Sequence, residues 1–149
     1  MFQLLRPVCP RLPTLFSLTQ LCNGPRAMSS PLDKVDNVDI DTGTFKYILI
    51  KVYYSPPGET ETSKFITRGY LSAGFHSDIY DKVVPAIEKL GLDCECMGGG
   101  RIRHELDNKT IEVYGYSQGY GRADHSITVD LLKVKYPDYD QIKFSNDGY

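Results

Sequence analysis

Two short segments of this 149-residue chain combine residue types that could bind an anion and attack it. His76 directly precedes Ser77-Asp78, a pair typical of a helix start. Imidazole is the side chain whose ordinary pKa lies nearest neutral pH. Ser117-Gln118-Gly119 lies between Gly115 and Gly121, and glycine-flanked turns expose N–H groups that bind phosphate oxygens. The two segments together indicate an anion site that contains a base or nucleophile.

A helix beginning beside His76 favours the same chemistry. The partial positive charge of a helix N-terminus disfavours imidazolium, so the ring stays neutral and nucleophilic. The free N–H groups of the first turn also bind anions, and Ser77 lies among them. A further run, Gly98-Gly99-Gly100-Arg101, predicts a second turn, but it lacks the Gly-Lys-Ser/Thr ending of a P-loop.

Three basic residues are candidate partners for a phosphate: Lys46, Arg68 and Arg101. Each stands at the edge of a predicted strand, where a solvated charge is the alternative interpretation. His76 could equally be a structural histidine, and the glycine-rich turn could be shaped by backbone geometry alone.

The other histidines and the cysteines point less clearly to chemistry. His104 and His125 are predicted to be surface residues or to support the site from behind. A zinc site made of Cys94, Cys96 and His104 lacks a fourth ligand. We therefore expect no metal and no cofactor, and we expect the four cysteines to be reduced thiols.

The length and composition fit one soluble globular domain. Three arginines and no acid precede Asp33, so the 14 basic and 19 acidic residues from there on give a net charge of −5. That balance argues against a nucleic-acid-binding protein, which needs a basic face. No apolar run is long enough to span a membrane, so we expect no membrane association.

Residues 1–32 are predicted to be an extension, and residues 33–149 the domain. The extension contains arginine, serine, threonine and leucine but no acid, as in a mitochondrial transit peptide. Three prolines, at 7, 10 and 13, oppose the amphipathic helix that such a peptide forms. The alternatives are a disordered tail or an isoform extension, with Met28 as a second start. A cytoplasmic location is expected unless residues 1–32 direct the chain to mitochondria.

Hydrophobic periodicity predicts strands alternating with two helices. Pro85 falls inside the first helix, where it predicts a kink or a restart. The predicted strands are 45–53, 64–69, 92–97, 101–106, 110–116 and 141–145, and the predicted helices are 77–90 and 123–135.

Several segments in one order resemble the protein phosphohistidine phosphatase family, also called the Janus/Ocnus family. The similarity covers roughly residues 38–149. It rests on Phe45-Lys46-Tyr47, Arg68-Gly69-Tyr70, His76-Ser77-Asp78-Ile79-Tyr80-Asp81, Cys94-Glu95-Cys96, Gly98-Gly99-Gly100-Arg101-Ile102, Val113-Tyr114-Gly115-Tyr116-Ser117, Lys135-Tyr136-Pro137-Asp138-Tyr139 and Asn146-Asp147-Gly148-Tyr149. The resemblance implies an α/β (α+β) fold: a single compact domain with a mixed β-sheet flanked by two helices.

The resemblance also implies an activity, the metal-independent removal of phosphate from phosphohistidine in proteins. His76 matches the family's catalytic histidine, as base or nucleophile, and Lys46 its substrate-binding lysine. Ser117, Gln118 and Gly119 match the phosphate-binding turn, while Arg68 and Arg101 match arginines near the site. The expected partners are phosphohistidine-containing proteins, and the expected state is a monomer. Two alternatives stay open: a phospho-recognition module without turnover, and a broader phosphoramidase or phospholysine phosphatase.

Overall fold

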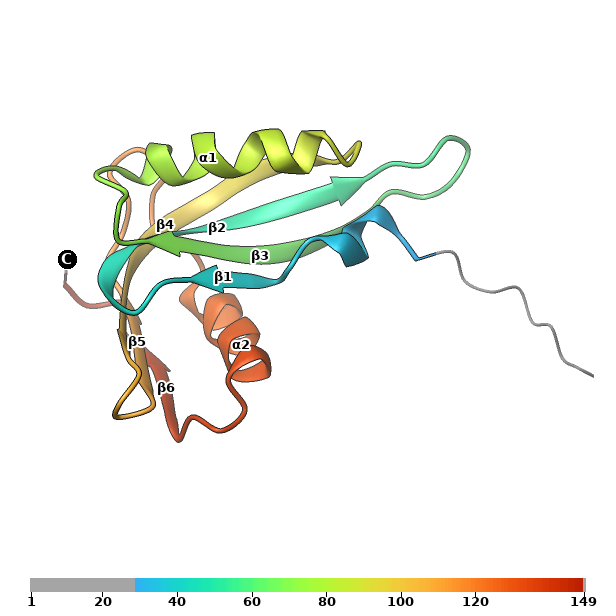
Figure 1. Ribbon diagram of the computed structural model, residues 1–149. Helices are drawn as coiled ribbons and strands as arrows, with labels where there is room; N and C mark the ends of the chain where they lie inside the picture. The colour runs from blue at the N-terminus through green and yellow to red at the C-terminus, as the bar shows by residue number, and fades with distance from the viewer. Residues whose placement is uncertain (1–28, 149) are drawn as a thin grey trace, which may run out of the picture.

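A computed structural model describes residues 29–148 as one α+β domain built on a six-stranded mixed sheet (Figure 1). The strand order is β1-β3-β2-β4-β5-β6; the edge pairs β1–β3 and β5–β6 are parallel, and the pairs between them are antiparallel. The elements are η1 (Pro31–Lys34), β1 (Val38–Ile40), β2 (Gly43–Tyr54), β3 (Thr62–Tyr70), α1 (His76–Glu88), β4 (Asp93–Glu105), β5 (Thr110–Tyr114), α2 (His125–Lys135) and β6 (Gln141–Phe144). The predicted mixed sheet with two helices is confirmed.

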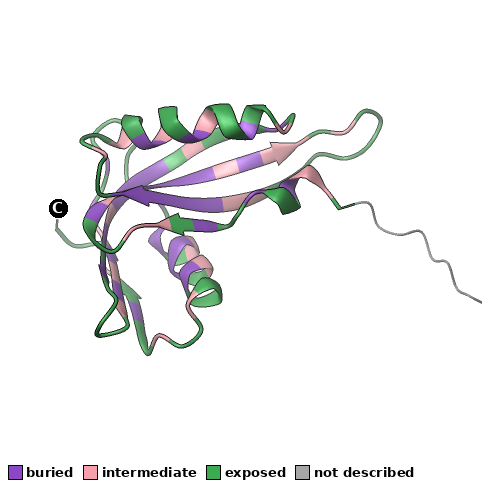
Figure 2. Ribbon diagram, in the orientation of Figure 1, coloured by how far each residue is buried: buried purple, intermediate pink, exposed green. Residues whose placement is uncertain are grey.

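The central strand β2 supplies both hydrophobic cores because successive side chains of a strand point to opposite faces. Ile48 and Ile50 pack with the buried stripe of α1 on one face. Tyr47 and Leu49 pack with α2 on the other. Figure 2 shows the resulting burial along the middle of the sheet, with the outer surface of α1 exposed. Lys46 has the same parity as Ile48, so it lies on the α1 face.

The prediction of a Gly-Arg turn at Gly98–Arg101 is wrong. These residues lie inside β4, which is one strand where the sequence pattern predicted two. Cys96 pairs with Ile50 and Gly98 pairs with Leu49, so Met97 is a β-bulge. The pairing with β2 outweighs the local turn preference of the glycines, and the bulge accommodates Gly98 at φ 132°.

Helix α1 begins one residue earlier than predicted. Its first residue is His76, and Phe75 occupies the N-cap position with extended backbone angles. Of the Ser77-Asp78 pair predicted at the helix start, Ser77 lies within the first turn and does not cap the helix, whereas the Asp78 carboxylate accepts the Phe75 N–H at 2.8 Å. The helix continues through Pro85 to Glu88 without a restart, and the Lys89 N–H donates to the Pro85 carbonyl at 3.2 Å.

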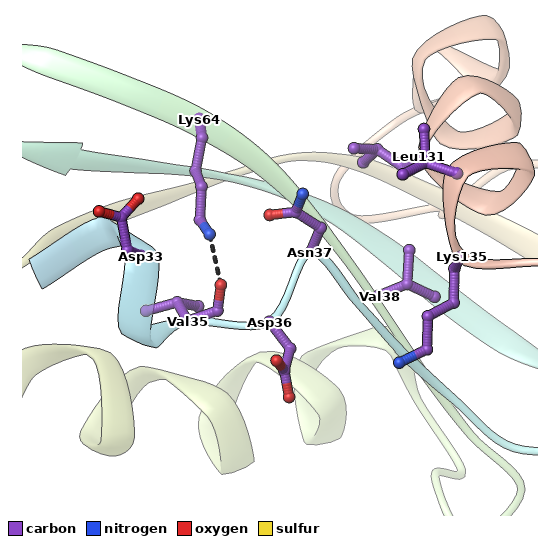
Figure 3. A pocket seen from close by; sticks show the side chains of 9 residues that line it. Asp33, Val35, Asp36, Asn37, Val38, Lys64, Leu131 and Lys135 are labelled. Carbon is purple, nitrogen blue, oxygen red and sulfur yellow. Dashed lines mark hydrogen bonds between the residues drawn. The ribbon is translucent and has the colours of Figure 1, made fainter. Parts of the chain in front are cut away.

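Partly buried polar contacts hold the N-terminal part of the domain against β3. The Lys64 ammonium donates to the Val35 carbonyl (Figure 3). Arg68, which is 7% exposed, donates to the carbonyl of Asp36 at 2.8 Å. Leu32 is buried in the core beside α1, so η1 extends across the expected domain boundary at residue 33.

The predicted extension, residues 1–32, lies outside the described residues except for its last four. Within residues 29–148, no helix has both the length and the apolar character needed to cross a membrane.

Candidate active site

Most of the predicted site residues line one cavity of about 590 Å³. Three parts of the chain form it: β2, the start of α1, and the loop between β5 and α2. We call it the His76 cavity. It is lined by Lys46, Gly74, Phe75, His76, Ser77, Ser117, Gln118, Gly119 and Tyr120.

A backbone contact fixes the tautomer of His76. Its Nε2 lies 2.9 Å from the carbonyl oxygen of Gly100. A carbonyl oxygen only accepts hydrogen bonds, so Nε2 carries the hydrogen and Nδ1 of the neutral ring holds the lone pair. The ring packs closely on β4, since a Cβ added at Gly99 would lie 2.7 Å from the His76 Cδ2. The glycine therefore makes room for the imidazole.

The surroundings of His76 keep its imidazole neutral. Burial lowers the pKa of His76 below its ordinary value, and the charges of Lys46 and Arg101 lower this pKa further. The bond to the Gly100 carbonyl acts in the opposite direction. At neutral pH the net result is a ring that can act as a base or nucleophile.

The turn after β5 is closed by its own hydrogen bonds. The Ser117 N–H donates to the Gly121 carbonyl at 3.0 Å, and the Gly121 N–H donates back to the Ser117 carbonyl at 2.8 Å. The Tyr120 N–H donates to the Ser117 hydroxyl oxygen at 3.2 Å, which leaves the hydroxyl hydrogen available to an anion. Gln118 and Gly119 are exposed at the tip. Among residues 29–148, their backbone N–H groups make no hydrogen bond.

The same loop is attached to β4 beside His76. The Gly99 N–H donates to the Gly121 carbonyl at 3.0 Å, and the Ala123 N–H donates to the Gly99 carbonyl at 3.1 Å. Gly99 therefore lies against the His76 imidazole, and its backbone N–H and carbonyl groups hold the loop that contains the Ser117 turn.

Of the three predicted cationic partners, one lines the cavity. Lys46 does so, and Arg101 is its directly paired residue in β4. Arg101 acts on the site by lowering the pKa of His76. The structure does not bring Arg68 to the cavity: its guanidinium is buried against the carbonyls of Thr67 and Asp36. It joins β3 to the segment before β1.

Sequence reasoning did not single out three of the lining residues, Gly74, Phe75 and Tyr120. One signal was available, because a phenylalanine stands where a helix start favours a polar cap. Tyr120 carries no comparable signal in the sequence, since its place depends on how the loop folds against α1.

Of the two predictions for His104 and His125, a surface position or a place behind the site, the surface position is wrong. They are 3% and 1% exposed. The His125 Nε2 lies 2.9 Å from the Gly115 carbonyl, and its Nδ1 lies 2.5 Å from the Tyr47 hydroxyl. Nε2 therefore donates, and Nδ1 accepts from Tyr47. The bond to Gly115 connects α2 to the residue just before the Ser117 turn.

A second cavity, of about 520 Å³, lies between η1, β3 and α2 (Figure 3). Its charged side chains are Asp33, Asp36, Lys64 and Lys135. The Lys64 ammonium is already hydrogen-bonded to the Val35 carbonyl, and no histidine or cysteine is in the lining. The described residues contain no group of three or more His, Cys, Asp or Glu side chains placed to hold a metal ion.

Comparison with known proteins finds a family model and relatives that each match most of the chain. Residues 32–140 match the sequence model of the Janus/Ocnus family. The "14 kDa phosphohistidine phosphatase" of Sus scrofa is 52% identical over 126 residues, which cover 83% of this chain and 99% of the relative. The Homo sapiens protein of the same name is 51% identical over 118 residues, covering 77% and 94%. The "Sex-regulated protein janus-A" of Drosophila pseudoobscura pseudoobscura is 47% identical over 120 residues, covering 79% and 80%.

Proposed function

The chain belongs to the Janus/Ocnus family, and we propose that it is a protein phosphohistidine phosphatase whose reacting group is His76. One observation carries this proposal. A half-buried histidine with its lone pair on Nδ1 shares a cavity with Lys46 and with the exposed N–H groups after Ser117. Two relatives more than 50% identical bear the name phosphohistidine phosphatase.

The residues of the cavity have separate roles in phosphoryl transfer. Lys46, the Ser117 hydroxyl and the N–H groups of Gln118 and Gly119 hold the equatorial phosphoryl oxygens and neutralise their charge. The first-turn N–H of Ser77 adds a donor from the end of α1. Arg101 adds positive charge beside His76. Arg68 has no direct part in this scheme, because its guanidinium binds backbone carbonyls.

The Nδ1 lone pair of His76 serves either of two routes. As a nucleophile it forms a P–N bond to the phosphoryl group while the substrate's P–N bond breaks. The departing imidazole takes a proton from solvent, and water then hydrolyses phospho-His76. As a general base it takes a proton from a water molecule that attacks phosphorus directly. Rapid-quench mass spectrometry distinguishes them, since only the first route adds a phosphoryl group to His76.

The phosphoramidate bond is labile, so positioning and charge neutralisation suffice, and we propose a reaction without metal or cofactor. The substrates are phosphohistidine-containing proteins, and the enzyme acts as a monomer in the cytoplasm. EDTA should leave the rate of phosphate release unchanged, and light scattering should give the mass of one chain.

Phosphate release from a phosphohistidine-containing protein tests the proposal. We expect saturable release that is insensitive to EDTA and absent in His76→Ala. Saturable binding without release would identify a phospho-recognition module. Equal kcat/KM for phospholysine and phosphohistidine peptides would identify a broader phosphoramidase.

A further inference from the structure

The side chain of the residue before His76 supports neither the helix nor the core. Phe75 occupies the N-cap of α1, where Ser, Thr, Asp and Asn are favoured because their side chains accept a first-turn N–H. A phenyl ring offers no such acceptor. The backbone substitutes for it: the Asp78 N–H donates to the Phe75 carbonyl at 3.2 Å, and the Asp78 carboxylate accepts the Phe75 N–H at 2.8 Å. The ring itself is 72% exposed.

A second aromatic side chain lines the same cavity from the opposite segment. Tyr120 belongs to the loop after β5, and its ring meets Tyr80 of α1 edge-on, with centroids 6.0 Å apart. The Tyr80 hydroxyl in turn donates to the Cys94 carbonyl at 3.1 Å. The ring of Tyr120 is therefore held in place, while the ring of Phe75 projects into solvent.

Phe75 and Tyr120 are the only large apolar side chains in the lining of the His76 cavity among the described residues. The rest of that lining is glycine, hydroxyl, amide, imidazole and ammonium. A phosphoryl group therefore has polar partners throughout, and the two rings are left to contact whatever the phosphoryl group is attached to. Together we call them the aromatic rim.

We propose that the aromatic rim recognises the imidazole ring of the phosphohistidine side chain, with Phe75 as its main specificity-determining residue. This inference rests on the proposed function. An imidazole is flat and aromatic, and aromatic pairs gain from offset-stacked or edge-to-face contact beyond their buried area. The alkyl chain of phospholysine and the bare amine of phosphoramidate lack that surface. The rim thus favours phosphohistidine at a site whose polar groups read only the phosphoryl oxygens.

Kinetics with matched substrates test the rim. Phosphoramidate contains the same P–N bond without a ring, so it reports on His76 and the anion-binding groups alone. We expect Phe75→Ser to lower kcat/KM for a phosphohistidine peptide about 2- to 10-fold and to leave phosphoramidate hydrolysis unchanged. Because serine is a better N-cap than phenylalanine, the melting temperature should stay the same or rise. Phe75→Tyr should retain the wild-type preference for phosphohistidine.

Leu71→Ser is the control, because Leu71 is 59% exposed on the same connection and does not line the cavity. Leu71→Ser should leave kcat/KM unchanged for the phosphohistidine peptide and for phosphoramidate. The proposed role of the aromatic rim would be overturned if Phe75→Ser lowered kcat/KM equally for both substrates, or did not lower it for the peptide. A wild-type protein that hydrolyses neither substrate would overturn the proposed function instead. In that case peptide affinity decides: weaker peptide binding by Phe75→Ser with unchanged inorganic phosphate binding supports the rim, and equal peptide binding overturns it.

Discussion

His76 and His125 occupy nearly equivalent positions on opposite faces of β4. Each is the first residue of a helix, and each donates through Nε2 to the backbone carbonyl of a glycine at 2.9 Å. Each also packs on the glycine run: a Cβ at Gly99 would meet His76, and a Cβ at Gly100 would meet His125. Burial is the first cause of a lowered pKa for both imidazoles.

The difference between the two histidines lies at Nδ1. In His125 this nitrogen accepts from the Tyr47 hydroxyl, which in turn accepts from Thr128 at 3.3 Å. Burial raises the pKa of Tyr47, so the phenol remains the donor. In His76 the ring lines the cavity between Lys46 and the Ser117 turn. The same residue type, tautomer and helix position thus give a structural hydrogen-bond network on one face and, in the proposed mechanism, the reacting lone pair on the other.

The largest expected effect is on catalysis at His76. His76→Ala should lower kcat/KM for phosphohistidine peptide by about 10²–10⁴-fold or more, because both routes need its Nδ1. Stability should fall by no more than about 1.5 kcal/mol, since the side chain is half exposed and makes one hydrogen bond. Phosphate release and urea unfolding measure the two quantities. A folded His76→Ala protein with wild-type turnover would show that His76, like His125, has no direct part in the chemistry.

The corresponding variant of the other histidine, His125→Ala, should lower the stability of the fold more than His76→Ala does. His125→Ala leaves a cavity and removes the acceptor of the buried Tyr47 hydroxyl, so we expect about 2–5 kcal/mol of destabilisation. Tyr47→Phe removes the other partner and completes a double-mutant cycle with His125→Ala. Urea unfolding of the four proteins gives the coupling energy. Independent, additive effects would show that the network contributes no stability beyond its separate members.

Substitutions at Gly99 and Gly100 compare the two histidine environments without removing either histidine. In Gly99→Ala the new methyl group would lie 2.7 Å from the His76 Cδ2 and 2.8 Å from the Tyr47 carbonyl oxygen. In Gly100→Ala it would lie 2.5 Å from the Tyr114 carbonyl oxygen and 2.8 Å from the His125 Cε1. Both should cost about 1–3 kcal/mol of stability through overpacking. At permissive temperature, Gly99→Ala should show the larger fall in kcat/KM, because it displaces the reacting ring. A larger fall in Gly100→Ala would contradict this expectation, and would mean that the bond from His76 to the Gly100 carbonyl matters more than the packing of the ring on Gly99.

The acid limb of the pH profile tests what holds His76 neutral. In the proposed mechanism the neutral ring is the active form, so kcat/KM should rise as pH increases through the His76 pKa, which burial lowers from the ordinary value of 6.5. Burial is the main cause, and the Lys46 charge adds to it. Lys46→Met should therefore move the limb to higher pH, and it should weaken inorganic phosphate binding about 10-fold.

Lys51→Met is the control, because Lys51 lies on the same strand but on the α2 face, over the rings of Tyr53 and Phe65. It should shift neither quantity. An acid limb that stays in place in Lys46→Met would mean that burial alone sets the pKa of His76.

The fold could be predicted where local pattern and tertiary environment agree. Strand β2 is rich in β-branched and aromatic residues and is buried on both faces, so its prediction from residues 45–53 is confirmed. Helix α2 is confirmed with its start two residues later than predicted, because Asp124 is the N-cap and its side chain accepts the Ser126 N–H. Strand β1 was not predicted, since its three residues gain their structure from pairing with β3.

The site could be predicted only in part, because some of its geometry depends on contacts distant in sequence. The glycines of β4 favour a turn locally, and only pairing with β2 shows that they make room for a ring on each face. Arg68 carries a charge suited to phosphate, but its direction is set by carbonyls of the segment before β1. The sequence likewise gives no sign that His125 is buried, since Tyr47 lies 78 residues away.

The smallest expected effect concerns residues 1–32, of which the structure describes only the last four. A chain begun at Met28 should keep the wild-type kcat/KM and melting temperature, because both networks lie between Tyr47 and Thr128. A fusion of residues 1–32 to a fluorescent protein separates the two interpretations of this segment. Mitochondrial fluorescence indicates a transit peptide, and diffuse fluorescence indicates an isoform tail. A chain begun at Met28 that is folded but inactive would contradict both, since it would mean that the segment contributes to the His76 cavity.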